Sequence, residues 1–335
     1  MKDAFPLNFI KGTGNEDIHM NLETAVSKPT NMRELEIALR EARRRRRKEE
    51  LIERFFLLNG LMAILILGGI FALLFLKAYP AFKELGIFQF FAGAVWNPTS
   101  YSTPRYGILS LIISSMMVTL GALVIAVPLG VACAAFISEM APKRAKEILK
   151  PAIEILAAIP SVVVGFLGIV LVNPIISKVF GVSHGLNALN GSILLAIMSL
   201  PTIVSLSEDA LRAVPRTYKE GSMALGANRW QTLVRVSIPS ALSGIIASIM
   251  LGMGRAIGET MTVLMATGNA PALTFNFLEA IQTMTATIAI ELGEVPYNTT
   301  HYYSLFVIGL VLFIMTFVVN LISDLILQKY QEVER

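Results

Sequence analysis

Residues 55–76 read FFLLNGLMAILILGGIFALLFL, a stretch without a single charged side chain. A helix needs about 20 mainly apolar residues to cross the hydrocarbon core of a bilayer, and this stretch is long enough. The whole chain has the same character, because 54% of its 335 residues are hydrophobic and only 16% are charged. In soluble domains about a quarter of the residues carry charge. We therefore predict an all-α membrane protein.

Five further stretches are apolar and long enough to cross a membrane. The six predicted transmembrane helices cover residues 55–76, 108–137, 153–176, 192–214, 241–267 and 303–327. The chain then divides into a tail with a basic helix (1–54), a first transmembrane helix (55–79), a core of five transmembrane helices (106–327) and a C-terminal segment (328–335). Proline and glycine within these stretches are compatible with a membrane bundle, because neighbouring helices satisfy the freed backbone groups.

Lysine and arginine are distributed unevenly between the predicted loops. Residues 43–48 form the basic run RRRRRK, and the loops after the second and fourth spans are also basic, whereas loop 268–302 has no Lys or Arg and three glutamates. Because basic loops stay on the cytoplasmic side, we predict a cell (inner) membrane protein with both termini in the cytoplasm. We expect the basic run to meet anionic membrane lipid rather than nucleic acid, and the tail before Pro29 to be flexible.

Motifs for catalysis are absent from the sequence. There is no GxxxxGK[ST] loop for nucleotide phosphates, no HExxH motif and no Cys/His metal pattern, and Cys133 is the only cysteine. Those motifs supply the chemical groups that nucleotide and metal sites require. We therefore expect a chain that is not itself an enzyme and that binds no metal. The interpretation as a membrane enzyme is not supported, because the sequence shows no set of catalytic residues.

The loop between the fourth and fifth predicted spans is unusual. Residues 216–239 read RTYKEGSMALGANRWQTLVRVSIP, which is too polar to cross a membrane and too long for a tight turn. Its apolar residues, interrupted at Gly226, predict two short amphipathic helices on the cytoplasmic surface. Such a protruding pair of helices suits docking to a partner protein.

The spacing of this loop resembles the EAA loop of ABC-importer permeases, in which a glutamate is followed six residues later by a glycine and then by an apolar, any, apolar, proline ending. The matching positions are Glu220, Gly221, Ser222, Gly226, Val236, Ile238 and Pro239, with Glu-Gly-Ser in place of Glu-Ala-Ala. The resemblance implies that the loop inserts into a cleft of a separate ATPase subunit, with Glu220 and Gly226 shaping the contact. We also expect the loop to move the fifth span directly, because the two are continuous in sequence.

Two more stretches narrow the resemblance. IEILAAIPSVVVGFLG (153–168) and GMGRAIGETMTVLMATGN (252–269) look like phosphate-transport permeases of the PstC type, and the related PstA type has a similar core. The resemblance covers residues 106–327 and implies the ABC type I importer permease fold. It also implies a complex with a second, PstA-like permease, two copies of a PstB-like ATPase and an external PstS-like phosphate-binding protein. ATP and Mg²⁺ would then bind to the ATPase subunits, and this chain would need no cofactor.

Arg255 lies near the middle of the fifth predicted span, and Glu259 follows on the same helical face. An arginine at such a depth costs about 2.5–3.5 kcal/mol, so something must compensate it. Either the two side chains neutralise each other, or both face a pathway. In the second case the guanidinium binds an oxyanion and the carboxylate accepts the acidic proton of phosphate. The resemblance implicates the matching Arg and Glu in transport.

Two alternatives remain open at this stage. The substrate could be another oxyanion such as sulfate or molybdate, although fully ionised sulfate has no proton to donate to Glu259. The chain could instead be a secondary transporter or channel that works alone. Such carriers often contain internal repeats, which the sequence lacks, and they have no use for the loop at Glu220.

Overall fold

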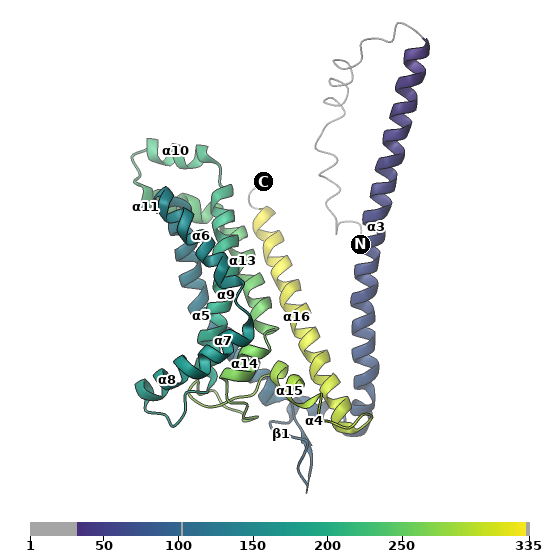
Figure 1. Ribbon diagram of the computed structural model, residues 1–335, viewed down its shortest axis with the longest axis vertical. Coiled ribbons are helices and arrows are strands. Elements are labelled where there is room, and N and C mark those ends of the chain that lie inside the picture. Colours follow the sequence, from purple (N-terminus) through teal and green to yellow (C-terminus); the bar gives the residue numbers. More distant parts are fainter. Residues whose placement is uncertain (1–31, 102, 333–335) are drawn as a thin grey trace. The chain divides into compact units, whose positions relative to one another are not determined.

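The computed structural model describes residues 32–101 and 103–332. Its helices are α3 (Met32–Leu85), α4 (Ile87–Ala92), α5 (Leu109–Ala135), α6 (Lys143–Ala157), α7 (Ser161–Leu167), α8 (Asn173–Phe180), α9 (Ala188–Ala213), α10 (Arg216–Ala224), α11 (Arg229–Thr232), α12 (Ile238–Ser240), α13 (Leu242–Ile257), α14 (Met261–Ala266), α15 (Met284–Glu291) and α16 (Thr300–Glu332) (Figure 1). Three π-helical turns are η1 (Phe136–Met140), η2 (Gly168–Val172) and η3 (Leu233–Ser237). Strands β1 (Trp96–Asn97) and β2 (Arg105–Tyr106) form an antiparallel hairpin.

The chain forms two units, Met1–Gly69 and Ile70–Arg335. In the first unit the described residues belong to α3, and apolar side chains such as Phe56 and Leu57 are exposed. The second unit holds the end of α3 and every other element. The tail expected before Pro29 lies outside the described residues, and only the helical backbone of the basic run 43–48 is described.

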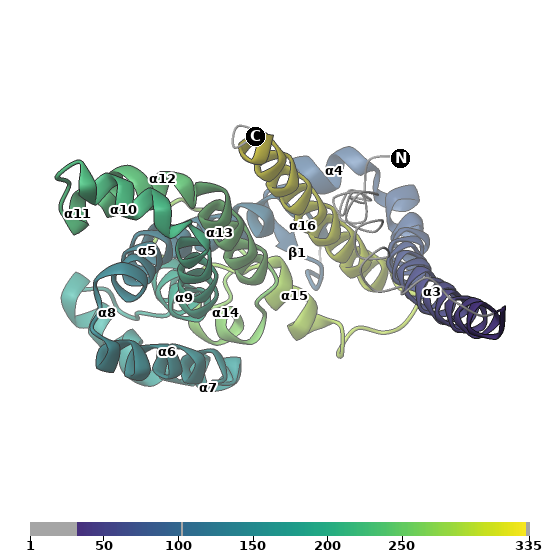
Figure 2. The ribbon, with the colours of Figure 1, turned by 90° about the horizontal axis from the view of Figure 1, so that it is seen from above.

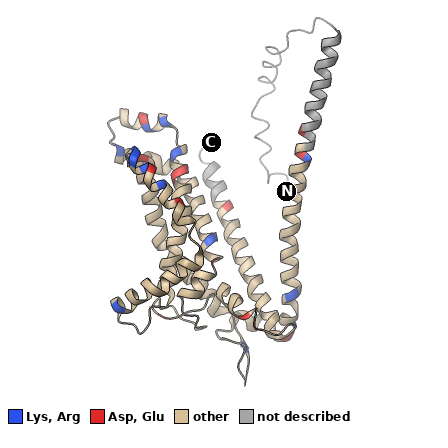
Figure 3. Ribbon diagram, viewed as in Figure 1, with Lys and Arg blue, Asp and Glu red and all other residues tan. Residues whose placement is uncertain are grey.

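The predicted all-α fold is confirmed. Five helical segments of the described chain are long and apolar enough to cross a membrane, namely Ile52–Leu85, Leu109–Met140, Ser161–Phe180, Ala188–Ala213 and Thr300–Ile326. The number reaches the predicted six when the bent pair Arg229–Ser240 and Leu242–Ile257 is counted as one span. Charged residues of the second unit gather around α6, α10 and α11, at one end of the bundle (Figure 3).

The third span begins later than predicted. The expected helix 153–176 is interrupted, because α6 ends at Ala157 and α7 begins only at Ser161. Pro160 explains the break, since a proline disfavours the helical conformation of the residue before it. The residues before the break belong instead to α6, which has no buried side chain.

The fifth span is broken twice, so the predicted continuous helix 241–267 is wrong. One break follows Ile257, where Gly258, Glu259 and Thr260 separate α13 from α14. Glycine weakens a helix interior by about 0.5–1 kcal/mol relative to alanine, which helps to place this break. The other lies at Ala241, where the helical axis bends by 70°. The loop and the span remain continuous in sequence, and the expectation that the loop moves the span directly stays a prediction.

Helix α9 is the centre of the second unit, where α5, α6 and α13 surround it (Figure 2). Small residues at a spacing of four, Gly244, Ser248 and Gly252, place one face of α13 against α9. The Oγ atoms of Ser248 and Ser207 lie 2.6 Å apart. Small residues let membrane helices approach closely, so that dispersion forces and hydrogen bonds hold them together.

The contact of Gly252 with Ile203 leaves no room for a larger side chain. A Cβ added at Gly252 would lie 2.8 Å from Ile203 Cγ1, whereas one added at Gly254 would come no closer than 3.7 Å to Asn320 Oδ1. Overpacking of this kind costs about 1–3 kcal/mol. We therefore expect Gly252→Ala to lower the thermal midpoint of unfolding in detergent, and Gly254→Ala to leave it unchanged or raise it slightly. Equal midpoints for the two variants would contradict this packing.

Candidate functional site

The loop 216–239 folds as a hairpin of short helices with Gly226 at its turn. The Gly226 amide donates to the Met223 carbonyl at 3.0 Å, and the Ala227 amide donates to the Ser222 carbonyl at 3.2 Å. This pair of hydrogen bonds is the Schellman motif, which requires a left-handed residue directly after the helix. Gly226 supplies it with a φ of +89°, a conformation that side chains disfavour. The prediction of two helices broken at Gly226 is confirmed.

The second helix of the hairpin is held equally closely. Asn228 and Gln231 form a reciprocal capping box, with nitrogen to oxygen distances of 2.8 and 2.9 Å. The hydroxyl oxygens of Ser222 and Thr232 lie 3.1 Å apart and join α10 to α11. Such local hydrogen bonds satisfy backbone groups at helix ends that would otherwise lack partners. The hairpin is therefore a preorganised unit.

Several apolar side chains of the hairpin are exposed. Leu225 is 92% exposed, Trp230 59% and Tyr218 58%. Glu220 is also exposed, and within the described part of the chain it has no hydrogen-bond or ion-pair partner. We call Glu220, Leu225 and Trp230 the docking face. A contiguous exposed apolar patch on a polar surface is typical of protein interaction sites, and tryptophan is enriched among the residues that dominate such contacts, so a docking role for these side chains is a prediction.

The remaining predicted loop residues have other surroundings. Gly221 is exposed within α10, whereas Val236 and Ile238 are half-buried. Ile238 packs against the buried cluster that contains Leu211 and Leu233, so the apolar end of the motif anchors the loop to the bundle.

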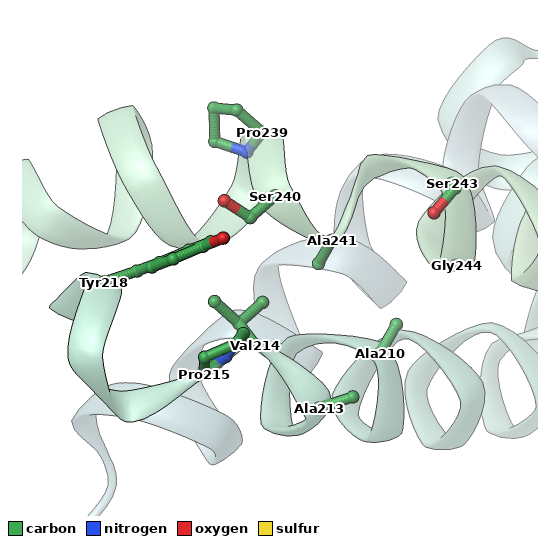
Figure 4. Close-up of a pocket in the computed structure, with 10 residues that line it drawn as sticks. All are labelled: Ala210, Ala213, Val214, Pro215, Tyr218, Pro239, Ser240, Ala241, Ser243 and Gly244. Atoms are coloured by element: carbon green, nitrogen blue, oxygen red, sulfur yellow. The ribbon is translucent and has the colours of Figure 1, made fainter. Parts of the chain in front are cut away.

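A groove of about 660 Å³ lies beneath the hairpin. It is lined by residues of α9, α10, α12, the start of α13 and the turns between them: Ala210, Ala213, Val214, Pro215, Tyr218, Pro239, Ser240, Ala241, Ser243 and Gly244. Figure 4 shows the Tyr218 ring reaching from α10 towards Ser240, with Val214 and Pro215 below it. Pro239, the last predicted loop residue, therefore lies at this groove.

A lysine connects α10 to the bundle. Lys219 Nζ lies 2.5 Å from Glu139 Oε1 and 3.2 Å from the Leu211 carbonyl oxygen. In the sequence, Lys219 is one of several basic residues of the loop after the fourth span, and Glu139 was not predicted as a site residue. The two residues are 80 positions apart, so no local spacing relates them. One sequence feature could have pointed to Glu139: it is an acidic residue at the end of an apolar span, on the side of the membrane where the loops are basic.

A second lysine holds α6 against α9. Lys150 Nζ donates to Glu208 Oε2 at 2.9 Å, and the Glu208 side chain is only 8% exposed. Lys146 Nζ, one turn earlier, donates to the Ser138 carbonyl at 2.6 Å. The hydrogen bond to Glu208 is the main cause that raises the pKa of the Lys150 ammonium above its usual value. This raised pKa means that the folded state favours the charged lysine.

The Lys150 contact predicts a pH-dependent contribution to stability. Lys150 is 40% exposed, so water screens the pair and we expect Lys150→Met to cost about 1 kcal/mol. Because the folded pKa is raised, this contribution is complete below about pH 10.4, the usual lysine pKa, and is lost as the pH rises through the folded value. Thermal unfolding of wild type and variant between pH 8 and 11.5 measures it. Lys143→Met changes an exposed lysine of the same helix, and its unfolding midpoint should match that of wild type at every pH. A difference in midpoint between wild type and Lys150→Met that stays constant over the whole pH range would contradict the linkage.

Arg255 and Glu259 do not form the pair that one reading of the sequence offered. Arg255 is exposed, and its Nη1 donates to Thr202 Oγ1 on α9 at 3.3 Å. Glu259 is half-buried, and its Oε1 accepts from the Thr262 amide at 3.3 Å. No ion pair joins the two in the described chain, because α13 ends at Ile257 and the i, i+4 relation of a continuous helix is lost. Both residues therefore lie at the break of a span, with Arg255 accessible.

A polar cluster fixes the opposite end of the second unit. Glu291 of α15 accepts from Trp96 Nε1 at 2.8 Å, and its other oxygen lies 2.6 Å from His301 Nε2. These bonds attach the β1–β2 hairpin to α15 and α16. Burial, and next the carboxylate of Glu84, raise the pKa of the Tyr106 phenol in the same hairpin. In the sequence, Glu291 is one of the three glutamates of loop 268–302 and has no feature that sets it apart.

An apolar helical bundle with a broken, charged span and a preorganised hairpin of short helices has the architecture of a multi-pass membrane permease. Residues 126–332 match the family described as "Binding-protein-dependent transport system inner membrane component", and the chain belongs to this family.

Relatives extend this similarity over most of the chain. A probable ABC transporter permease protein, YqgH of Bacillus subtilis, is 39% identical over 258 residues, which cover 76% of this chain and 83% of that protein. The phosphate transport system permease protein PstC of Mesorhizobium japonicum is 32% identical, covering 81% of this chain and 87% of its own. PstC of Haemophilus influenzae is 30% identical, covering 85% and 94%.

A solved structure supports the fold. A chain of the MetNI methionine ABC transporter, in an inward-facing conformation, superposes with a TM-score of 0.51 and 19% identity, covering 67% of this chain and 94% of that one. At this identity the similarity concerns architecture, and the ABC importer permease fold expected from the sequence is confirmed.

Proposed function

We propose that this chain is the permease subunit of an ATP-driven importer of inorganic phosphate. Relatives named as phosphate permeases cover more than four fifths of the chain, which supports the substrate class. The observation that carries the proposal is the exposed guanidinium of Arg255 at the break of an apolar span. An exposed charge inside a membrane bundle faces a polar route rather than lipid.

The chemistry of the break suits a protonated oxyanion. The guanidinium offers several N–H donors in a planar fork to phosphate oxygens. The carboxylate of Glu259 accepts a hydrogen bond from the acidic proton that phosphate retains near neutral pH. Sulfate and molybdate remain the competing substrates, and Glu259 is the residue that disfavours them because it repels a fully ionised oxyanion.

The docking face defines how the permease is driven. We place it in a cleft of an ATPase subunit, two copies of which bind ATP and Mg²⁺, so that this chain needs no nucleotide site of its own. A second, homologous permease completes the pathway, and an external phosphate-binding protein delivers the substrate. Closure of the ATPases then alternates access to the break between the two sides of the membrane. We place the docking face on the cytoplasmic side of the membrane, together with the basic loops and both termini.

Substitutions at the break test the substrate proposal. We expect Arg255→Lys, which loses the fork, and Glu259→Gln to reduce binding-protein-dependent phosphate uptake in reconstituted complexes at least tenfold. Arg144→Lys and Glu147→Gln, both on exposed positions of α6, serve as matched controls and should transport normally. Uptake at the wild-type rate by both break variants, in complexes that contain the ATPase, would contradict a role in the pathway. Uptake of sulfate in preference to phosphate by wild type would favour the competing substrate.

Substitutions of Gly226 test the docking proposal. The left-handed φ of this residue costs a branched side chain most and asparagine least. We therefore expect the amount of copurified ATPase to fall in the order Gly226, Gly226→Asn, Gly226→Val. Equal losses for asparagine and valine would show that space at the contact, and not backbone conformation, selects glycine. No loss with either variant would count against docking through this turn.

A further inference from the structure

Helix α10 rests on the bundle with little apolar contact. None of its side chains is buried, and it packs mainly on η3 and α11 within its own loop. The groove of about 660 Å³ lies between it and the start of α13 (Figure 4). Packed apolar surfaces would transmit a movement by steric contact. η3, in the second half of the hairpin, has such a surface, because Leu233 lies in the buried cluster that contains Ile137 and Leu211, but α10 itself has none.

The backbone between the hairpin and α13 is poorly suited to transmit a movement. Between the loop segment Arg229–Ser240 and α13 (Leu242–Ile257) the axis bends by 70°. A bend at a loop or element end is where hinges absorb motion. A displacement of the hairpin is therefore expected to reach the spanning helices through side-chain contacts, which for η3 and α12 are the apolar ones of Leu233 and Ile238, rather than through the backbone at Ala241.

Lys219 gives α10 its own contact with the spanning helices. Its ammonium joins α10 to Glu139 in η1, at the end of the α5 span, and to the Leu211 carbonyl in the last turn of α9. The Lys219 and Glu139 side chains are only 16% and 21% exposed, so water screens the ion pair weakly. Among the described residues of α10, Lys219 alone has a hydrogen bond or ion pair to a spanning helix. Charge-assisted hydrogen bonds of this kind are about twice as strong as neutral ones.

Helix α9 leads from this contact to the break. Leu211 and Thr202 lie on the same unbroken helix, nine residues or about 13.5 Å apart at 1.5 Å per residue. Thr202 Oγ1 accepts the hydrogen bond from Arg255. A shift of α9 therefore displaces a group that touches the guanidinium, without passing the bend at Ala241.

We propose that Lys219 is the positioning residue that passes movement of the docked hairpin to α5 and α9, and through Thr202 to Arg255. The ion pair with Glu139 then couples ATP hydrolysis to substrate movement, while the docking face only binds the ATPase. This inference rests on the proposed function, because Lys219 can couple ATP hydrolysis to transport only if the loop docks to an ATPase. It distinguishes binding of the partner from use of its energy.

Coupling is measured in the complete complex, reconstituted in proteoliposomes with the binding protein, as phosphate molecules transported per ATP hydrolysed. We expect Lys219→Met to retain the ATPase and its hydrolysis but to lower this ratio at least tenfold. Lys219→Arg keeps the charge and should retain at least a third of the wild-type ratio. Lys143→Met removes an exposed lysine of α6 and should equal wild type. The double variant Lys219→Glu with Glu139→Lys restores the ion pair with reversed sign and should exceed both of its single variants.

Several outcomes overturn the inference. A wild-type ratio for Lys219→Met shows that the contact transmits nothing. Loss of the ATPase from the purified Lys219→Met complex assigns Lys219 to docking instead. A double variant no better than its single variants removes the ion pair as the connection. The proposed function fails separately, and already in wild type, if the complex contains no ATPase or transports no phosphate.

Discussion

The close packing of α9 against its neighbours is the constraint on which the second unit depends. Lipid tails are as apolar as leucine, so burial of apolar side chains does not by itself drive membrane helices together. Small residues on α13 and α5 replace that driving force with close contact, and Ile203 meets Gly252 from one helix and Gly130 from the other. Because α9 is held from several sides, it has a defined position from which the site residues are arranged.

Charge in an apolar bundle explains the placement of the functional groups. Glu208 and Glu139, near the ends of spans, are each contacted by a lysine from a helix outside the spans. Each contact compensates a carboxylate and at the same time attaches a peripheral helix to the bundle. Arg255 has no such counter-ion in the described chain and is accessible at a break. The difference separates ion pairs that hold the structure from the one guanidinium proposed to meet a substrate.

The hairpin shows how much of the site local sequence can predict. Its two helices, the break at Gly226 and its polar ends follow from turn and capping residues that act within a few positions of one another. The contacts of Lys219 with Glu139 and of Arg255 with Thr202 link residues 80 and 53 positions apart, and no pattern in a single sequence relates such pairs. The span boundaries were predicted from apolar length alone, which does not detect the break at Pro160 or the one after Ile257.

The sequence by itself determined that this is a multi-pass helical membrane protein, because apolar length and scarcity of charge are local properties that a bilayer enforces. It also determined the hairpin, through residues that act on their own backbone. Only the tertiary structure decided that Arg255 and Glu259 are separate, and that Lys219 reaches two spans. Those facts depend on where one helix ends and which other helix lies beside it, and both are set by packing between distant segments.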